Sequence, residues 1–140
     1  MSTATPGTSV VLDASVAFRA EVDRDEQALH WFTAAAHEEV HAVWPDLALV
    51  EIAHGLLRLA RTGWLSVAEA LRMASRLLAA PVSVEPVAPL TLPAYLVAAE
   101  RKLSVYDATY VVLAESRNAQ LVTADRRLAA STEKSVLIGE

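Results

Sequence analysis

The chain contains no cysteine, which excludes disulfide bonds and metal sites built from thiolates. A chain without cysteine suits a reducing compartment, so we expect a cytoplasmic protein. It also lacks any uninterrupted apolar run of about 18 residues, so no membrane span is predicted. Residues 1–9 have neither a basic flank nor an apolar core, which argues against a signal peptide. We expect residues 1–8 to form a short disordered lead-in.

Basic charge is scarce as well. The 140 residues include 12 Lys and Arg against 17 Asp and Glu, a net charge of −5. This balance argues against a broad basic surface that binds nucleic acid irrespective of its sequence. It does not exclude a local nucleic-acid site: if four acids bind a cation, the other charged residues have a net charge of only 12 − 13 = −1. The length predicts one domain, residues 1–140, with a sizeable core.

Five short apolar segments alternate with helical patterns along the chain. The expected strands are residues 8–13, 40–44, 82–87, 121–125 and 135–138. The expected helices are a short one capped by Ser15, then residues 26–37, 45–61, 66–80, 91–102, a helix opened by Ser104, and residues 126–131. This alternation predicts an α/β fold with a central, mostly parallel sheet flanked by helices in an α/β/α sandwich. Pro86 places the third strand near an edge.

The helix opened by Ser104 carries an acid into its first turn. Ser104 followed by Asp107 matches a capping box, and the residues from Ala108 to Ala114 are almost all apolar. Such a helix belongs inside a domain, with Asp107 at the rim of the core. Asp is also favoured there by the helix dipole, so Asp107 alone is equally compatible with a capping role.

Three more acids have similar positions. Asp13 and Asp125 end predicted strands, at the sheet edge where α/β proteins bind ligands. Glu51 lies within an apolar part of a predicted helix, where an unpartnered charge is costly. Converging carboxylates repel one another unless a hard cation such as Mg²⁺ or Mn²⁺ joins them. A site of that kind is best suited to phosphodiester hydrolysis.

Two hydroxyl residues stand beside the strand-end acids. Thr123 lies two residues before Asp125, where it is suited to orient a water or a ligand, or to serve the strand alone. Ser15 follows Asp13 and is interpreted as the N-cap of the first helix.

The segment from His37 to His41 matches the zinc-protease pattern H-E-x-x-H. That chemistry requires both histidines on one face of a continuous helix. Residues 40–43 alternate as a strand and Pro45 follows, so we expect the helix to end inside the motif.

Residues 45–80 form a predicted helical hairpin that bears several arginines. We place Leu47, Val50, His54, Leu57 and Arg61 on one stripe of its first helix. Arg58 lies about two turns after Glu51. It either contacts RNA phosphate or belongs to a solvated face. The three tryptophans, Trp31, Trp44 and Trp64, are expected in the core.

Four segments together resemble the PIN-domain ribonucleases, and among them the VapC-type toxins of bacterial toxin–antitoxin pairs. They are residues 10–16, 45–51, 103–108 and 121–128. The resemblance implies that Asp13, Glu51, Asp107 and Asp125 are the catalytic, metal-binding acids of an endoribonuclease that uses Mg²⁺, with Mn²⁺ as a substitute. It makes Ser15 and Thr123 accessory site residues.

The same resemblance implies three partners: an RNA substrate, a cognate VapB-type antitoxin and a second copy of the chain. Arg58 and Arg61 are the expected contacts to RNA or antitoxin. Two alternatives remain open at this point. One is a catalytically silent binding module with the same fold, and the other is the zinc protease built on His37 and His41.

Overall fold

The structure is a computed structural model and describes residues 8–139, so the expected lead-in, apart from Thr8, lies outside the described residues. Within them, five strands form one sheet in the order β3-β2-β1-β4-β5, and every neighbouring pair is parallel. The strands are β1 Ser9–Leu12, β2 His41–Pro45, β3 Ser83–Glu85, β4 Gln120–Thr123 and β5 Ser135–Leu137. All five predicted strands are therefore present, and β3 is an edge strand as Pro86 indicates.

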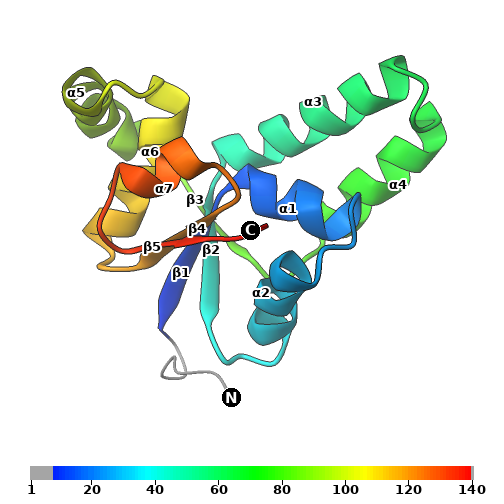
Figure 1. The fold of residues 1–140 in the computed structure, drawn as a ribbon, viewed down its shortest axis with the longest axis horizontal. Helices are drawn as coiled ribbons and strands as arrows, with labels where there is room; N and C mark the ends of the chain where they lie inside the picture. Colours follow the sequence, from blue (N-terminus) through cyan, green and yellow to red (C-terminus); the bar gives the residue numbers. More distant parts are fainter. Residues whose placement is uncertain (1–7, 140) are drawn as a thin grey trace.

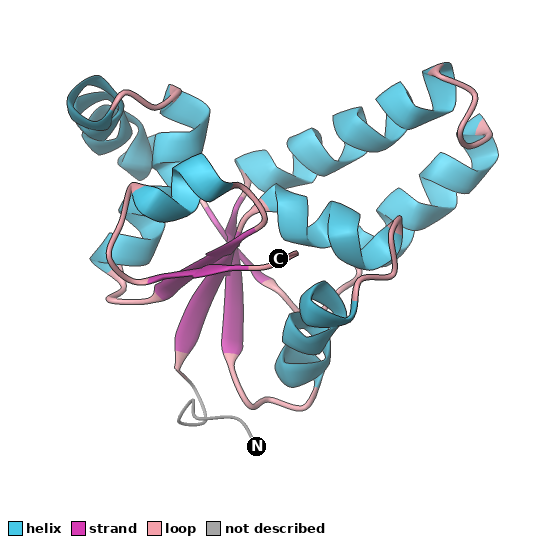
Figure 2. Cartoon of the chain, in the orientation of Figure 1, coloured by secondary structure: helices cyan, strands magenta, loops and turns pink. Residues whose placement is uncertain are grey.

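Helices flank the sheet on both sides, which confirms the predicted α/β/α fold (Figure 2). The helices are α1 Ala14–Glu21, α2 Glu26–Ala36, α3 Leu47–Arg61, α4 Val67–Leu78, α5 Thr91–Arg101, α6 Val105–Ser116 and α7 Arg126–Ala130, with a 3₁₀ turn, η1 Ala88–Leu90. Helix α6 packs against β1, β2 and β4. Among residues 8–139 there is no helix with the length and apolarity needed to cross a membrane.

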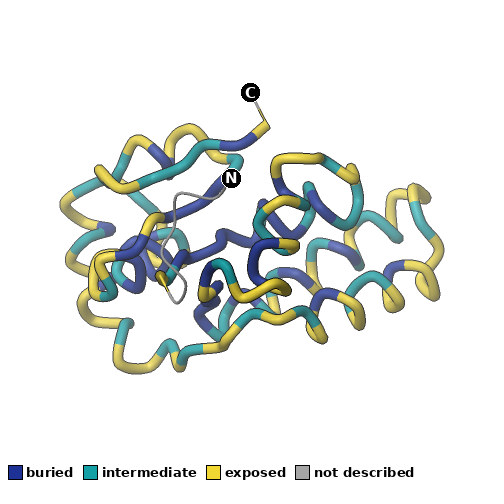
Figure 3. The backbone as a smooth tube through the Cα atoms, turned by 90° about the horizontal axis from the view of Figure 1, so that it is seen from below, coloured by how far each residue is buried: buried dark blue, intermediate teal, exposed yellow. Residues whose placement is uncertain are grey.

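The core follows the three central strands β1, β2 and β4, which are mostly buried (dark blue in Figure 3), whereas the edge strands β3 and β5 are exposed or half-buried. Trp44 on β2 is 1% exposed and meets Phe32 edge-to-face at 6.1 Å between ring centroids. Its burial agrees with the sequence prediction. The prediction was wrong for Trp64, which follows α3 and is 77% exposed. Trp31 is half-buried and packs against the core.

Helices α3 and α4 form the expected hairpin, which projects from the sheet (Figure 1). The sequence placed its apolar stripe on the wrong face of α3. The buried residues are Ala48, Ile52 and Leu56, spaced four apart, whereas Val50 is 68% exposed. Ile52 and Leu56 are 0% and 1% exposed whereas Val50 is exposed, so α3 has apolar residues on both faces and hydropathy alone did not identify the buried one.

The helix ends mostly follow the predicted signals. Ser66 and Glu69 form a complete capping box at α4. Ser104 accepts a hydrogen bond from the backbone N–H of Asp107 at 3.0 Å and caps α6. Ser15 is not the N-cap of α1, contrary to the prediction: α1 begins at Ala14, and Asp13 occupies the cap position.

Candidate active site

Asp13 ends β1 at the carboxyl edge of the sheet and is only 8% exposed. The hydroxyls of Ser15 and Thr123 both donate to its Oδ2, at 2.6 Å and 2.8 Å. Burial raises the pKa of Asp13 above its ordinary value, and these two hydrogen bonds oppose the rise. The two hydroxyls share one carboxylate oxygen, so neither occupies Oδ1.

The direction of these hydrogen bonds is set by the backbone. Ser15 Oγ accepts from the N–H of Ala124 at 3.0 Å, and Thr123 Oγ1 accepts from the N–H of Asp125 at 3.0 Å. A backbone N–H only donates, so each hydroxyl proton is left to point at Asp13. The pair thus ties the end of β1 to the end of β4, its neighbour in the sheet. The resemblance predicted both Ser15 and Thr123 as accessory site residues, but their hydrogen bonds to Asp13 were not predicted: Thr123 was expected to orient a water or a ligand, and Ser15 to cap a helix.

Glu51 is half-buried on α3 and accepts a hydrogen bond from the hydroxyl of Tyr110 at 2.9 Å. Burial raises the pKa of Glu51, the charges of Asp13 and Asp107 add to the rise, and the Tyr110 hydrogen bond opposes it. The sequence reasoning missed this role of Tyr110, which it counted as an apolar residue of α6. No local pattern joins positions 51 and 110, because only the fold brings these residues of α3 and α6 together.

Asp107 and Asp125 complete the four predicted acids. Burial raises the pKa of half-buried Asp107, with a further contribution from the charge of Asp125, while the nearby Arg127 guanidinium lowers it. Asp125 is exposed and caps α7, its Oδ1 accepting from the backbone N–H groups of Arg127 and Leu128 at 2.9 Å and 3.2 Å. Arg127 is itself anchored by a hydrogen bond to the carbonyl of Lys102 at 2.6 Å.

The four acids are linked electrostatically in an overlapping series. Asp13 acts on Glu51, Asp107 acts on Asp13 and Glu51, and Asp125 acts on Asp107. Even so, in residues 8–139 no three His, Asp or Glu side chains stand close enough together to hold a metal ion without moving. The donor set is nevertheless suited to Mg²⁺ or Mn²⁺, because it consists of oxygen ligands, and burial together with neighbouring negative charge raises the pKa values of three of these carboxyls.

The zinc-protease pattern does not form a site. Helix α2 ends at Ala36, His37 is its C-cap, and Glu38 has a left-handed backbone with φ of 58°. His41 belongs to β2, where its Nε2 lies 2.8 Å from Ser83 Oγ. The two histidines share no helix face, which is the requirement of that chemistry, and the expected end of the helix inside the motif is confirmed.

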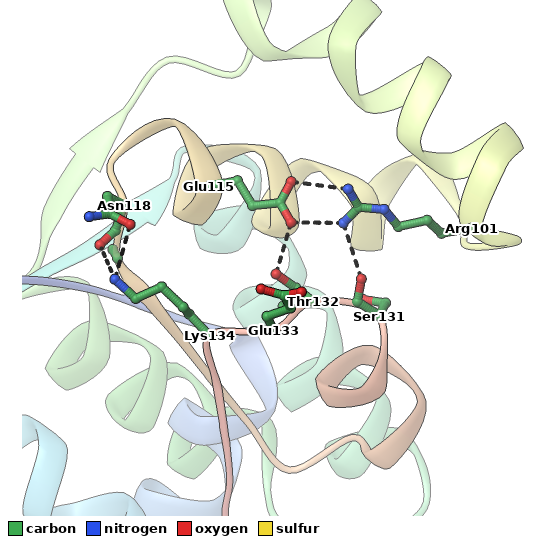
Figure 4. A pocket seen from close by; sticks show the side chains of 8 residues that line it. Arg101, Glu115, Asn118, Ser131, Thr132, Glu133 and Lys134 are labelled. Carbon is green, nitrogen blue, oxygen red and sulfur yellow. Dashed lines mark hydrogen bonds and ion pairs between the residues drawn. The ribbon is translucent and has the colours of Figure 1, made fainter.

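A polar surface cavity of about 380 Å³ lies between the ends of α5 and α6 and the loop before β5 (Figure 4). Glu115 makes two hydrogen bonds to Arg101, at 2.8 Å and 3.2 Å, and accepts another from Thr132 at 2.9 Å. Lys134 donates to the backbone and side-chain oxygens of Asn118. The cavity borders the amino end of β4, whereas Asp13 and Asp125 follow carboxyl ends, and Arg101 pairs with Glu115 while Asn118 binds Lys134. These hydrogen bonds connect α5, α6 and the loop before β5, so we assign the cavity a structural role.

Comparisons with known proteins agree with this geometry. A sequence profile of the PIN domain matches residues 10–134. The chain is 36% identical over 124 residues to ribonuclease VapC3 of Pyrobaculum aerophilum, covering 86% of this chain and 92% of that protein. It is 40% identical over 119 residues to ribonuclease VapC9 of Mycobacterium tuberculosis, covering 85% and 87%.

Two crystal structures share the fold. PAE2754 from Pyrobaculum aerophilum matches with a TM-score of 0.75 and 30% identity, over 94% of this chain and 84% of that one. VapBC2 from Rickettsia felis, bound to a DNA fragment from its promoter, matches with a TM-score of 0.68 over 94% and 98%. At 12% identity the second likeness shows the fold alone.

Proposed function

The chain belongs to the PIN domain family, and on that premise we propose that it is a divalent-metal-dependent endoribonuclease, the toxin of a toxin–antitoxin pair. The observation that carries the proposal is that buried Asp13 and half-buried Glu51 and Asp107 lie near enough to neighbouring carboxylates for their charges to raise the three pKa values in addition to the effect of burial. Two relatives at 36% and 40% identity bear the name ribonuclease VapC, which supports the same activity here. The absence of cysteine suits a cytoplasmic toxin that meets cellular RNA.

In this proposal Asp13, Glu51, Asp107 and Asp125 hold Mg²⁺, for which Mn²⁺ substitutes. When bound, the cation acidifies an attacking water and neutralises charge on the phosphate and the leaving oxygen. The water oxygen bonds to phosphorus while the bond from phosphorus to the departing ribose oxygen breaks. Ser15 and Thr123 fix the orientation of Asp13 through Oδ2, so that Oδ1 is presented to the cation.

The proposed antitoxin, a VapB-type protein, covers the hairpin of α3 and α4. Support comes from its exposed apolar residues Val67 and Leu71, 65% and 66% exposed, which border a cavity of about 180 Å³ between the two helices. Arg58 and Arg61 are exposed on the same hairpin and offer contacts to antitoxin or RNA. A partner bound here is able to direct a basic side chain at the carboxylates and compete with the cation.

We also propose that the protein forms a homodimer through α5. Leu92, Tyr95 and Leu96 are 76%, 62% and 67% exposed on this helix, and large apolar residues gathered on one surface are typical of interfaces. Light scattering is expected to give twice the mass of one chain, and a Tyr95→Lys variant to give the mass of a single chain. A monomeric native protein would contradict this part of the proposal.

The nuclease is tested on total cellular RNA. We expect cuts at defined positions with Mg²⁺, none after chelation with EDTA, and suppression when the antitoxin is added. Mapping of the cut ends identifies the RNA target. The second candidate, a silent binding module, predicts that the same RNA is retained on a filter and left intact under every condition. Uncut RNA with Mg²⁺ present would therefore reject the nuclease.

A further inference from the structure

Tyr110 has no role in the chemistry described so far, yet its hydroxyl lies among the acids. It is on α6, one turn after Asp107, and is 0% exposed. Its hydroxyl donates to Glu51 Oε1 at 2.9 Å, across the contact between α6 and α3. A side chain without exposed surface does not reach RNA, so the hydroxyl acts on Glu51 and not on substrate.

The hydroxyl is held as a donor. A tyrosine hydroxyl is protonated at neutral pH, since its ordinary pKa is about 10, and this one lies 2.9 Å from Glu51 Oε1. The phenol therefore keeps its proton. A neutral phenol facing a carboxylate has one favourable orientation, with its proton toward the carboxylate oxygen.

Glu51 needs such a partner more than the other three acids do. The carboxylate of Asp13 is fixed by two hydroxyls, and that of Asp125 accepts from two backbone N–H groups of α7, whereas Asp107 lies in the first turn of α6 and its backbone N–H donates to Ser104. Glu51 sits in mid-helix on a longer side chain, and the charges of Asp13 and Asp107 disfavour its ionised form there. Its hydrogen bond to Tyr110 opposes this repulsion and directs one carboxylate oxygen.

We propose that Tyr110 is the positioning residue of Glu51, holding this carboxylate in the orientation in which it serves the proposed metal site. The inference rests on the proposed function. Because Tyr110 also follows Asp107 on α6, it fixes the distance between an acid on the α3–α4 hairpin and an acid on the sheet-covering helix. Partners of metal ligands that fix their orientation in this way change metal affinity when they are removed.

The test is Tyr110→Phe, which removes one oxygen atom and keeps the ring in the core. Calorimetry with Mn²⁺ is expected to show binding weakened by about 10- to 100-fold, the usual effect of losing such a partner. The matched control is Thr109→Val, which deletes the neighbouring buried hydroxyl on α6. Thr109 is 2% exposed and donates only to the carbonyl of Val105, at 2.8 Å in the described structure. We expect native Mn²⁺ affinity in the control.

A double-mutant cycle with Glu51→Gln separates positioning from general destabilisation. If Tyr110 acts through Glu51, Tyr110→Phe weakens Mn²⁺ binding in the native background and changes it no further in the Glu51→Gln background. A merely structural role predicts the same loss in both. Native Mn²⁺ binding by Tyr110→Phe would overturn the inference alone. Failure of the unsubstituted protein to bind Mn²⁺ or cut RNA would overturn the proposed function together with it.

Discussion

Replacing Thr123 by Val tests the most buried hydrogen bond of the site. Thr123 is 0% exposed, donates to Asp13 Oδ2 at 2.8 Å and accepts from the N–H of Asp125 at 3.0 Å. A hydrogen bond to a charged group contributes about 1.5–3 kcal/mol to stability. Asp125 is exposed, so water is able to reach its freed N–H and little further loss is expected. We therefore expect a loss of about 2 kcal/mol at neutral pH.

That loss of stability lowers the melting temperature by a measurable amount. The unfolding entropy of a 140-residue domain is about 0.3 kcal/mol/K, so about 2 kcal/mol lowers the midpoint by about 7 °C. Calorimetric melting in EDTA checks this value without interference from bound metal. The matched control is Thr109→Val, whose hydroxyl donates to a neutral backbone carbonyl, and its loss is expected to be about 1 kcal/mol.

The pH dependence distinguishes the two variants. The Thr123 hydrogen bond lowers the pKa of Asp13, so its removal raises a folded-state pKa that burial already holds above the unfolded value. The folded variant then binds the proton at higher pH than the native protein does. Its deficit is full above both folded pKa values and falls below them to about 1 kcal/mol, the contribution of a hydrogen bond to a neutral acceptor, because Asp13 is then protonated in both proteins. The deficit of Thr109→Val stays constant. A constant deficit in Thr123→Val would refute an ionised Asp13 held by Thr123.

Two further predictions concern charge at the site and on the hairpin. Asp107→Asn is expected to abolish RNA cleavage. In metal-free buffer above the raised pKa of Asp107, the variant is expected to be as stable as the native protein or slightly more stable, because it lacks a half-buried charge repelled by Asp125. Full activity with saturating Mg²⁺ would show that Asp107 is only a helix-cap residue. Reversing the charges of Arg58 and Arg61 to Glu is expected to weaken antitoxin binding by at least about tenfold, measured by calorimetry, with Mn²⁺ affinity changed much less. Unchanged antitoxin affinity would leave both arginines as a solvated face.

The fold was largely predictable because its signals are local. Apolar runs that stop at an acid marked β1 and β4, and capping residues marked the starts of α4 and α6. The error on α3 has a physical cause: Val50 is as apolar as buried Ile52, and hydropathy alone does not distinguish two apolar faces of one helix. Trp64 was also misassigned: its size suggested burial, but it lies in the loop that joins α3 to α4 in the projecting hairpin.

The site was predictable only in part. Each acid was visible from its place at the end of a strand or within an apolar helix, and the neighbouring positions of β1 and β4 agree with the expectation for Asp13 and Asp125. Ser15 and Tyr110 were not recognised as partners of Asp13 and Glu51. The Tyr110 contact joins residues 59 positions apart, and the bond from Thr123 to Asp13 spans 110. Such pairs depend on how helices and strands pack, and single-chain patterns do not encode that information directly.

The central claim is that the four carboxylates bind one or more divalent cations by modest side-chain movement. The most direct measurement is anomalous diffraction from crystals grown with Mn²⁺. We expect a peak within about 2.0–2.2 Å of carboxylate oxygens from Asp13 and at least one of Glu51, Asp107 and Asp125. The Asp125 carboxylate is expected to turn from its cap on α7 if it joins the ion. A protein that cuts RNA in the same Mn²⁺ concentration but shows no peak among these carboxylates would contradict the account.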